Sequence, residues 1–186
     1  MLVFCAFSGQ AQEDLRINQL QFVGSHNSYK LKMNPVVFVA LSALDSKIAQ
    51  SLDYSHIPID AQLDLGIRKL ELDVFFDAMS NTFVVGHVQL IDMKSNCSLL
   101  RECFKVLLDW SAGNSQHVPI WISFNAKDQK IDGLPDPDVF SDQAFRLLDR
   151  HIEESFEERL IWPRDVEELN WPSVDDARGK FIFVLD

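Results

Sequence analysis

Short apolar runs and longer amphipathic stretches alternate along the chain. The runs rich in β-branched and aromatic residues, which favour strands, cover residues 69–76, 83–87, 118–124 and 181–185. Apolar residues at helical spacing predict helices over 98–112 and 139–158. A shorter helix is predicted between Pro58 and Gly66, because proline and glycine are typical of helix starts and stops. Strands that alternate with helices predict a parallel α/β architecture.

A further buried strand is predicted over residues 17–23, where apolar and β-branched side chains recur. Gly24 interrupts this strand, and His26 and Asn27 follow in a loop. Imidazole has the side-chain pKa nearest neutral, so a histidine held at a strand end can take a proton from a hydroxyl group. Asn27 offers an uncharged oxygen that suits a hard cation or a phosphate-bound network. A lone histidine after a strand is more often structural, so the case for chemistry depends on later residues.

The strand at 69–76 places two carboxylates on one face. Glu71 and Asp73 alternate with apolar residues that point to the other face. Residues 74–76 continue as an apolar run, which indicates a strand covered on both sides. Two carboxylates are costly to bury without a counter-charge, and a cation between them would remove this conflict. Oxygen ligands favour calcium or magnesium. The alternative is an ordinary solvated sheet face.

Polar residues also follow two later strands. The run 83–87 ends in His87, and the strand at 118–124 is followed by Asn125 and Lys127. In a β/α barrel the carboxyl ends of the strands carry the active site, so these residues are candidates for chemistry together with His26. Three further histidines are interpreted as structural or surface residues: His56, His117 and His151.

Composition and net charge indicate which kinds of binding partner the protein can have. With 186 residues and 47% apolar content, the chain has the size and core of one globular domain. Its formal net charge is −11, and residues 126–186 contain 16 acidic against 8 basic residues. This balance argues against a nucleic-acid partner and against simple electrostatic docking to anionic membranes. An anionic substrate remains compatible, because a bound divalent cation can reverse the local charge.

The first residues carry a possible targeting signal. Residues 1–12 have the short apolar run and the small residues that end a secretory signal, although the usual basic segment is missing. The alternative is a short capping strand or helix. In a secreted chain Cys97 and Cys103 are expected to form a disulfide, and otherwise both are expected to be reduced core cysteines. Residues 35–41 are apolar on nearly all sides and predict a helix that is either buried or interfacial.

Several separated motifs, in the same order along the chain, resemble the secreted calcium-dependent phosphoinositide phospholipase C family. They are Gly24-Ser25-His26-Asn27-Ser28-Tyr29, Leu52-Asp53-Tyr54-Ser55-His56, residues 62–74, Gly86-His87-Val88 followed by Ser95-Asn96-Cys97, and Arg178-Gly179-Lys180. The resemblance implies a TIM-like β/α barrel of which the N-terminal half to two-thirds is present. The expected organisation is a signal-peptide remnant at 1–12 and a phospholipase C-like catalytic domain at 13–186, truncated at its C-terminus.

The resemblance also implies a reaction and its residues. His26 would be the base that removes the proton from the inositol 2-hydroxyl, which then attacks the neighbouring phosphorus. His87 would be the acid that protonates the departing diacylglycerol oxygen, and Lys127 would contact the phosphate. The expected products are diacylglycerol and an inositol cyclic phosphate. The implied protein is secreted, acts on a phosphoinositide or a related phosphodiester, and makes transient contact with a membrane surface.

Calcium is the implied cofactor. Its expected ligands are Asn27, Glu71, Asp73 and Asn125. The last of these departs from the family, which has a glutamate at that position. An asparagine oxygen can still bind calcium, but the site has one negative charge fewer, so a lower affinity is expected.

Two alternatives stay open. A glycerophosphodiester phosphodiesterase also uses a histidine pair and a Glu-x-Asp metal motif on this barrel, but that family has His-Arg-Gly where this chain has His26-Asn27-Ser28. A non-catalytic remnant that binds metal or phosphodiester would agree with Asn125 and with the short chain, whereas His26 and His87 argue against it. The sequence leaves the head-group preference and the oligomeric state open.

Overall fold

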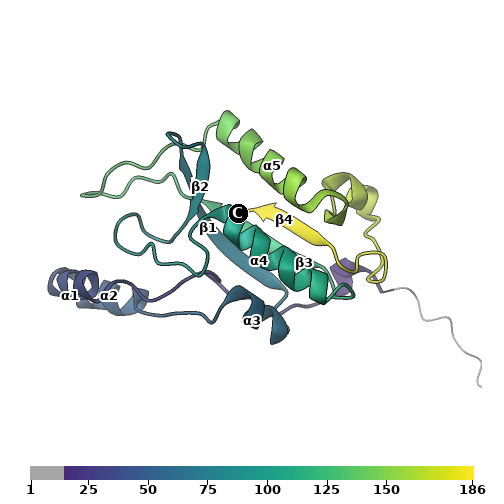
Figure 1. Ribbon diagram of the computed structural model, residues 1–186, viewed down its shortest axis with the longest axis horizontal. Coiled ribbons are helices and arrows are strands. Elements are labelled where there is room, and N and C mark those ends of the chain that lie inside the picture. The colour runs from purple at the N-terminus through teal and green to yellow at the C-terminus, as the bar shows by residue number, and fades with distance from the viewer. Residues whose placement is uncertain (1–14) are drawn as a thin grey trace, which may run out of the picture.

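A mixed sheet of four strands lies at the centre of the computed structural model, which describes residues 15–186, with the backbone alone at 167–169 (Figure 1). The strands are β1 (Lys69–Asp77), β2 (Thr82–Val85), β3 (Ile120–Ala126) and β4 (Phe181–Leu185). They lie in the order β2-β1-β3-β4. β1, β3 and β4 are parallel, and β2 runs antiparallel to β1. The α/β class predicted from the sequence is confirmed.

The prediction of parallel strands is wrong for β2. Residues 78–81 alone connect β1 to β2, and so short a connection can form a hairpin but not the crossover that parallel strands need. The Asp77 carboxylate fixes the turn by accepting hydrogen bonds from the N–H groups of Met79 and Ser80. Asn81 closes the turn with a φ of 51°, a left-handed conformation that asparagine tolerates.

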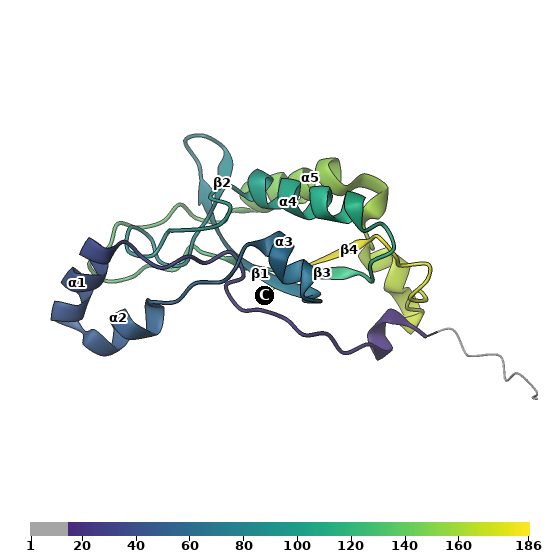
Figure 2. The ribbon, with the colours of Figure 1, turned by 60° about the horizontal axis from the view of Figure 1, so that its bottom comes forward.

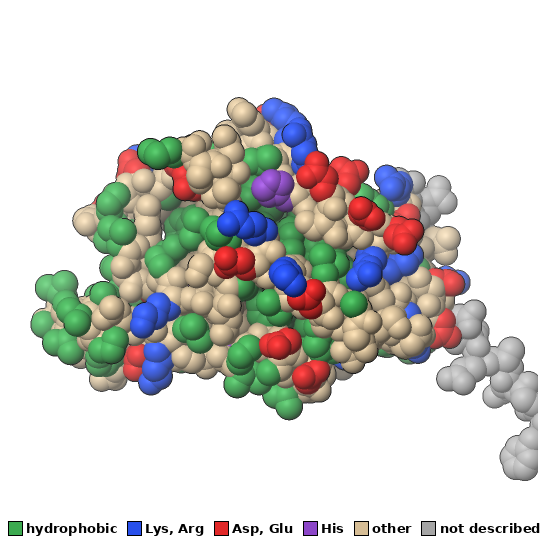
Figure 3. Space-filling model, in the orientation of Figure 1, with side chains coloured by type: hydrophobic (Ala, Val, Ile, Leu, Met, Phe, Trp, Pro, Cys, Tyr) green, Lys and Arg blue, Asp and Glu red, His purple; other side chains and the backbone are tan. Residues whose placement is uncertain are grey.

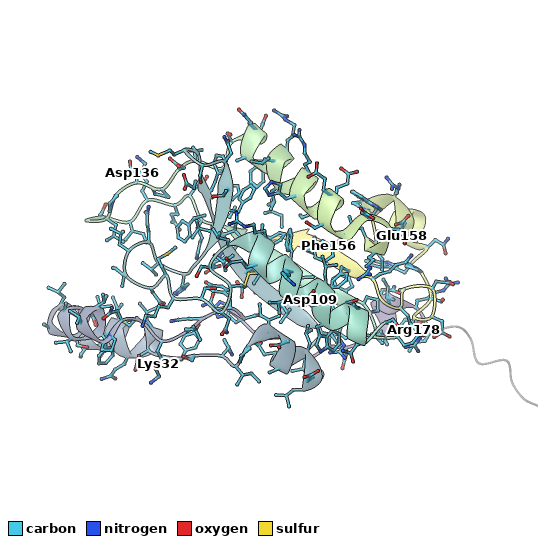
Figure 4. All side chains as sticks on the ribbon, in the orientation of Figure 1. Lys32, Asp109, Asp136, Phe156, Glu158 and Arg178 are labelled. Carbon is cyan, nitrogen blue, oxygen red and sulfur yellow. A yellow bond between two sulfur atoms is a disulfide. The ribbon has the colours of Figure 1, made fainter. Side chains whose placement is uncertain are left out.

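Two long helices cover one face of the sheet (Figures 1 and 2). They are α4 (Leu100–Gly113) and α5 (Asp142–Phe156). The rings of Phe104 and Phe156 meet between these helices with their centroids 5.0 Å apart. Phe156, which Figure 4 labels on α5, also contacts Phe181 of β4 at 4.7 Å. The apolar side of the sheet is therefore closed by aromatic packing.

The opposite face of the sheet carries polar side chains. Glu71 lies in register with Ser123, and Asp73 lies in register with Asn125, so these four side chains share one face. Glu71 is 5% exposed and Asp73 is 1% exposed. The predicted alternation along β1 is therefore confirmed, and the alternative of a solvated sheet face is wrong.

The buried strand predicted before Gly24 is wrong. The segment contains a 3-10 helix, η1 (Ile17–Gln19), and Val23 is 69% exposed. Its apolar residues serve another contact, because Ile17 is buried in a second apolar cluster that includes Ile182. The segment meets the sheet at Gly24, which forms a single parallel bridge with Lys69. A Cβ at residue 24 would lie 3.0 Å from the Lys69 Cβ, so glycine permits this approach.

Three shorter helices precede β1, and two 3-10 segments follow α5. They are α1 (Pro35–Leu44), α2 (Ser46–Leu52), α3 (Ile59–Asp64), η2 (Glu157–Arg159) and η3 (Pro163–Leu169). α1 and α2 project from one end of the molecule (Figure 2). No residue of α1 is buried, so the buried alternative for this apolar helix is wrong. Within residues 15–186, no helix is long and apolar enough to cross a membrane.

Cys97 and Cys103 form a disulfide at the start of α4. Of the two states predicted for these cysteines, the structure shows the disulfide. Residues 1–12, interpreted above as a signal remnant, lie outside the described residues.

Candidate active site

The loop that contains His26 is hydrogen-bonded to β1. The Ser28 N–H donates to the Glu71 carbonyl at 3.0 Å, and the Glu71 N–H donates to Ser28 Oγ at 2.8 Å. The Asn27 N–H donates to Glu71 Oε2 at 3.1 Å. Asn27 has a φ of 50°, in the left-handed region that asparagine adopts more readily than most residues. The conformation of the loop and the position of the Glu71 carboxylate are therefore fixed together.

His26 stands at the exposed rim of this loop. Its side chain is 75% exposed, and its Nε2 lies 3.6 Å from Glu71 Oε2. The His26 carbonyl oxygen lies 2.8 Å from Nε2 of His56, so His56 supports the backbone of the loop. An exposed imidazole beside a carboxylate can take a proton from a hydroxyl group and remain stabilised afterwards.

Asp73 lies deeper and is almost fully buried. The Tyr29 hydroxyl donates to Asp73 Oδ2 at 2.9 Å, and Lys127 Nζ lies 3.2 Å from the same oxygen. Burial and the neighbouring Asp73 raise the pKa of Tyr29, which keeps this hydroxyl a donor. Asp73 Oδ1 is buried and has no hydrogen-bond partner in the described part of the chain. A cation could bind this free oxygen.

The structure brings the four predicted calcium ligands to one region. The Tyr29 hydroxyl lies 3.4 Å from Asn27 Oδ1 as well as bonding Asp73, and Asn125 lies in register with Asp73. Glu71 is bonded to the Asn27 N–H. Oxygen donors of this kind, together with the orphaned Asp73 Oδ1, fit calcium in donor type. Two of the four side chains are amides, and among residues 15–186 no three His, Cys, Asp or Glu side chains converge as a metal site.

A buried ion pair holds His87 at the end of β2. His87 Nδ1 lies 3.1 Å from Asp92 Oδ2, and Asp92 Oδ1 lies 2.8 Å from Lys30 Nζ. The side chains of Asp92 and Lys30 are fully buried, whereas that of His87 is 20% exposed. The Gly86 N–H donates to the Asp73 carbonyl at 3.2 Å. This bond joins the segment that carries His87 to Asp73 of β1.

His87 and Lys127 line one pocket of about 110 Å³. Its walls also include the apolar side chains Phe75, Ile131 and Leu134. An imidazole and an ammonium that face one cavity suit an anionic group, because the first can donate a proton and the second can offset charge. The structure thus pairs His87 with Lys127 and His26 with Glu71. Asp73 contacts Lys127 directly, and the Tyr29 hydroxyl links it to Asn27, whose N–H bonds Glu71.

Sequence reasoning missed Lys30, Asp92 and Tyr54 as parts of this region. Tyr54 accepts a hydrogen bond from Asn27 Nδ2 at 2.7 Å, and Lys30 Nζ lies 4.7 Å from the centre of the Tyr54 ring. Tyr54 belongs to a motif quoted above and Lys30 directly follows another, which is the one signal that could have identified them. Asp92 lies 62 positions after Lys30, and no local pattern indicates that they pair.

The histidines interpreted as structural have structural contacts. His117 is buried, with its ring nitrogens 2.9 Å from Ser111 Oγ and 2.7 Å from the Val118 carbonyl. His151 packs edge-on against Phe83.

Comparisons with known proteins identify the family of this chain. The family model described as "Phosphoinositide phospholipase C, Ca2+-dependent" matches residues 15–84 and 78–186. None of the curated proteins matches the chain.

Similar solved structures include three bacterial enzymes. The calcium-dependent phosphoinositol-specific phospholipase C of a Pseudomonas species is 19% identical with a TM-score of 0.61, over 93% of this chain and 58% of that one. The calcium-dependent phosphatidylinositol-specific phospholipase C of Streptomyces antibioticus is 21% identical with a TM-score of 0.61, over 88% and 51%. The phosphatidylinositol-specific phospholipase C of Listeria monocytogenes is 13% identical with a TM-score of 0.63, over 93% and 53%. At these identities the likeness concerns the fold, and the chain spans between a half and three-fifths of each structure.

Proposed function

Because the chain belongs to the family of calcium-dependent phosphoinositide phospholipases C, we propose that it cleaves the phosphodiester bond of a phosphoinositide lipid. One observation supports this proposal most. Asp73 contacts Lys127 of a pocket pair, His87 and Lys127, and is linked through Tyr29 and Asn27 to a rim pair, His26 and Glu71. The first pair can accept a proton, and the second can donate a proton and offset anionic charge.

In the proposed reaction His26 removes the proton from the inositol 2-hydroxyl, and the hydroxyl oxygen forms a bond to the neighbouring phosphorus. The bond between phosphorus and the glycerol oxygen breaks, and His87 donates its proton to that oxygen. The products are diacylglycerol and a cyclic inositol phosphate. Glu71, 3.6 Å from His26 Nε2, stabilises the imidazolium formed in the first step. Lys127 contacts the phosphate from the pocket that it shares with His87.

We propose that calcium is held by Asn27, Glu71, Asp73 and Asn125. When bound, it would offset the phosphate charge and make the attacking hydroxyl more acidic. The support for this site is its set of oxygen donors and the buried Asp73 Oδ1 that no other described residue reaches. Asn125 lowers the negative charge of the site relative to a glutamate, which supports a weaker affinity.

Contact with the lipid surface is proposed for α1. The helix contains no charged residue, and Val36, Val39 and Leu44 are 77%, 68% and 86% exposed. Figure 3 shows hydrophobic side chains gathered over the end of the molecule that α1 and α2 form. Lys32, labelled at the base of this projection in Figure 4, is exposed and pairs with Asp53. Because the net charge is −11, apolar insertion rather than charge attraction would bind the membrane.

We also propose that the chain forms part of a TIM-like β/α barrel and that the protein is secreted. Three parallel strands with helices over one face, and the likeness to the bacterial enzymes, support residues 13–186 as the N-terminal part of a TIM-like β/α barrel. The disulfide between Cys97 and Cys103 supports secretion, since disulfides persist in oxidising environments. Because the chain belongs to the phospholipase C family, we do not propose a glycerophosphodiester phosphodiesterase.

The test is release of inositol phosphate from phosphatidylinositol vesicles by the 186-residue protein, with calcium or with a chelator. We expect calcium-dependent release that His26→Ala and His87→Ala abolish. His151→Gln is the matched control, because His151 lies against Phe83 and outside the site. Calcium binding without release would identify a non-catalytic binding protein, and release that neither variant reduces would contradict the assigned residues.

A further inference from the structure

Asp92 holds both the backbone and the side chain of His87. The Asp92 carbonyl accepts hydrogen bonds from the N–H groups of His87 at 2.9 Å and Val88 at 3.2 Å. Its carboxylate Oδ2 lies 3.1 Å from His87 Nδ1. The turn between the two residues is tight, with Leu90 in the left-handed region at a φ of 62°. The imidazole therefore has little freedom to rotate.

Lys30 supplies the counter-charge for Asp92. Its Nζ lies 2.8 Å from Asp92 Oδ1 and donates to the Leu52 carbonyl at 2.8 Å. Both charged side chains are fully buried, so each needs the other to remain ionised. An ionised carboxylate can only accept hydrogen bonds. The proton shared between Asp92 and the neutral His87 ring must therefore reside on Nδ1.

We infer that Asp92, paired with Lys30, is a positioning residue for His87, fixing the ring proton on Nδ1 and leaving Nε2 for the pocket. The inference rests on the proposed function, in which His87 is the acid. After Nε2 has given its proton to the departing glycerol oxygen, the neutral ring carries its remaining proton on Nδ1. This is the tautomer that Asp92 stabilises, so the ring need not reorient between turnovers.

The charges that face His87 come from several elements. Asp92 lies on its own loop, Lys30 comes from the loop after η1, and Lys127 follows β3 and lines the same pocket with Asp73 of β1 as its partner.

The test uses the double variant Lys30→Met/Asp92→Asn, which removes both buried charges and leaves neither unpaired. The matched control is Lys105→Met/Asp109→Asn, which removes an exposed ion pair from α4 (Figure 4 labels Asp109). The tautomer of His87 is determined from the imidazole ¹⁵N chemical shifts of the protein without substrate. We expect the Nδ1–H tautomer in the wild type and the control, and a mixture in the double variant.

Activity gives the second measurement. We expect kcat of the double variant to fall by about 100-fold, with KM within about threefold, because substrate binding does not use the Lys30–Asp92 pair. An unchanged tautomer, or an unchanged kcat in an active wild-type protein, would overturn the inference. If the wild type releases no inositol phosphate but the variant still loses its tautomer preference, the positioning role stands and the proposed function fails.

Discussion

Lys127 Nζ lies 3.2 Å from Asp73 Oδ2, with the lysine 24% and the carboxylate 1% exposed. The positive charge of Lys127 therefore lies beside Asp73, which is also a proposed calcium ligand. Glu71 and Asp73 contribute two negative charges and Lys127 one positive charge, which leaves a single net negative charge. Asn125, in register with Asp73, adds none. The calcium affinity of this site should therefore depend on both Asn125 and Lys127.

Restoring a carboxylate at position 125 should strengthen calcium binding. We expect Asn125→Glu to lower the Kd for calcium by roughly tenfold or more, because it adds a full negative charge close to the ion. Isothermal titration calorimetry measures this affinity without substrate. Asn125→Gln is the control, since it lengthens the side chain and keeps it neutral. Equal affinity in the two variants would show that residue 125 does not contact calcium.

Removing the charge of Lys127 should strengthen calcium binding and lower activity. Lys127→Met leaves Asp73 without its ammonium partner, so we expect calcium to bind more tightly, on the order of tenfold. Activity should fall, because the phosphate loses its contact in the pocket. Lys130→Met serves as control, because Lys130 pairs with Asp136 at the surface. If calcium affinity falls in Lys127→Met, the lysine and the ion do not share Asp73.

The position of β1 and the two faces of its buried part could be predicted from the sequence. The alternation of Glu71 and Asp73 with apolar neighbours fixes which face each side chain occupies, and the continued apolar run indicates burial on both faces. The sequence predicts only that Asn125 and Asp73 lie near each other, because the carboxyl ends of parallel strands meet at one edge of a sheet. The register itself depends on tertiary packing.

Other features depend on contacts that local patterns do not reveal. The apolar residues before Gly24 predict a strand, but Ile17 buries its apolar side chain in a separate cluster. Lys30 would be expected at the surface, and it is buried because Asp92, distant in sequence, neutralises it. A long-range ion pair of this kind leaves no periodic signal in the chain.

His117 should make the stability of the protein depend on pH. Burial lowers the pKa of His117 below its usual value. In the unfolded chain a histidine takes up a proton near pH 6.5, whereas the buried ring stays neutral to lower pH. The unfolded state then binds more protons, so the free energy of unfolding contributed by this group is complete above about pH 6.5 and is lost as the pH falls below it.

Urea unfolding at about pH 7.5 and pH 5.5 checks this dependence. We expect His117→Gln to lose less stability between the two values than the wild type does. His151→Gln is the matched control, because His151 is only partly buried. The same pH dependence in His117→Gln and in the wild type would contradict the assignment to His117.

The exposed face of α1 should bind lipid. We expect Val36→Asp/Val39→Asp to weaken binding to phosphatidylcholine vesicles containing phosphatidylinositol by roughly tenfold, because two exposed apolar side chains no longer insert. The free energy of unfolding should change by less than about 0.5 kcal/mol per substitution, since both side chains face solvent. Met79→Asp is the control, because Met79 is 96% exposed and lies in the turn after β1. Equal vesicle binding by the double variant and this control would exclude α1 as the contact.

Phosphorus NMR of the reaction with a short-chain phosphatidylinositol tests the central claim most directly. Attack by the inositol 2-hydroxyl, with His26 as base and His87 as acid, predicts that a five-membered cyclic inositol phosphate is the first product. It should require calcium and disappear in both alanine variants. An acyclic inositol phosphate formed without the cyclic product, or no turnover with calcium bound, would contradict the assignment of His26 and His87.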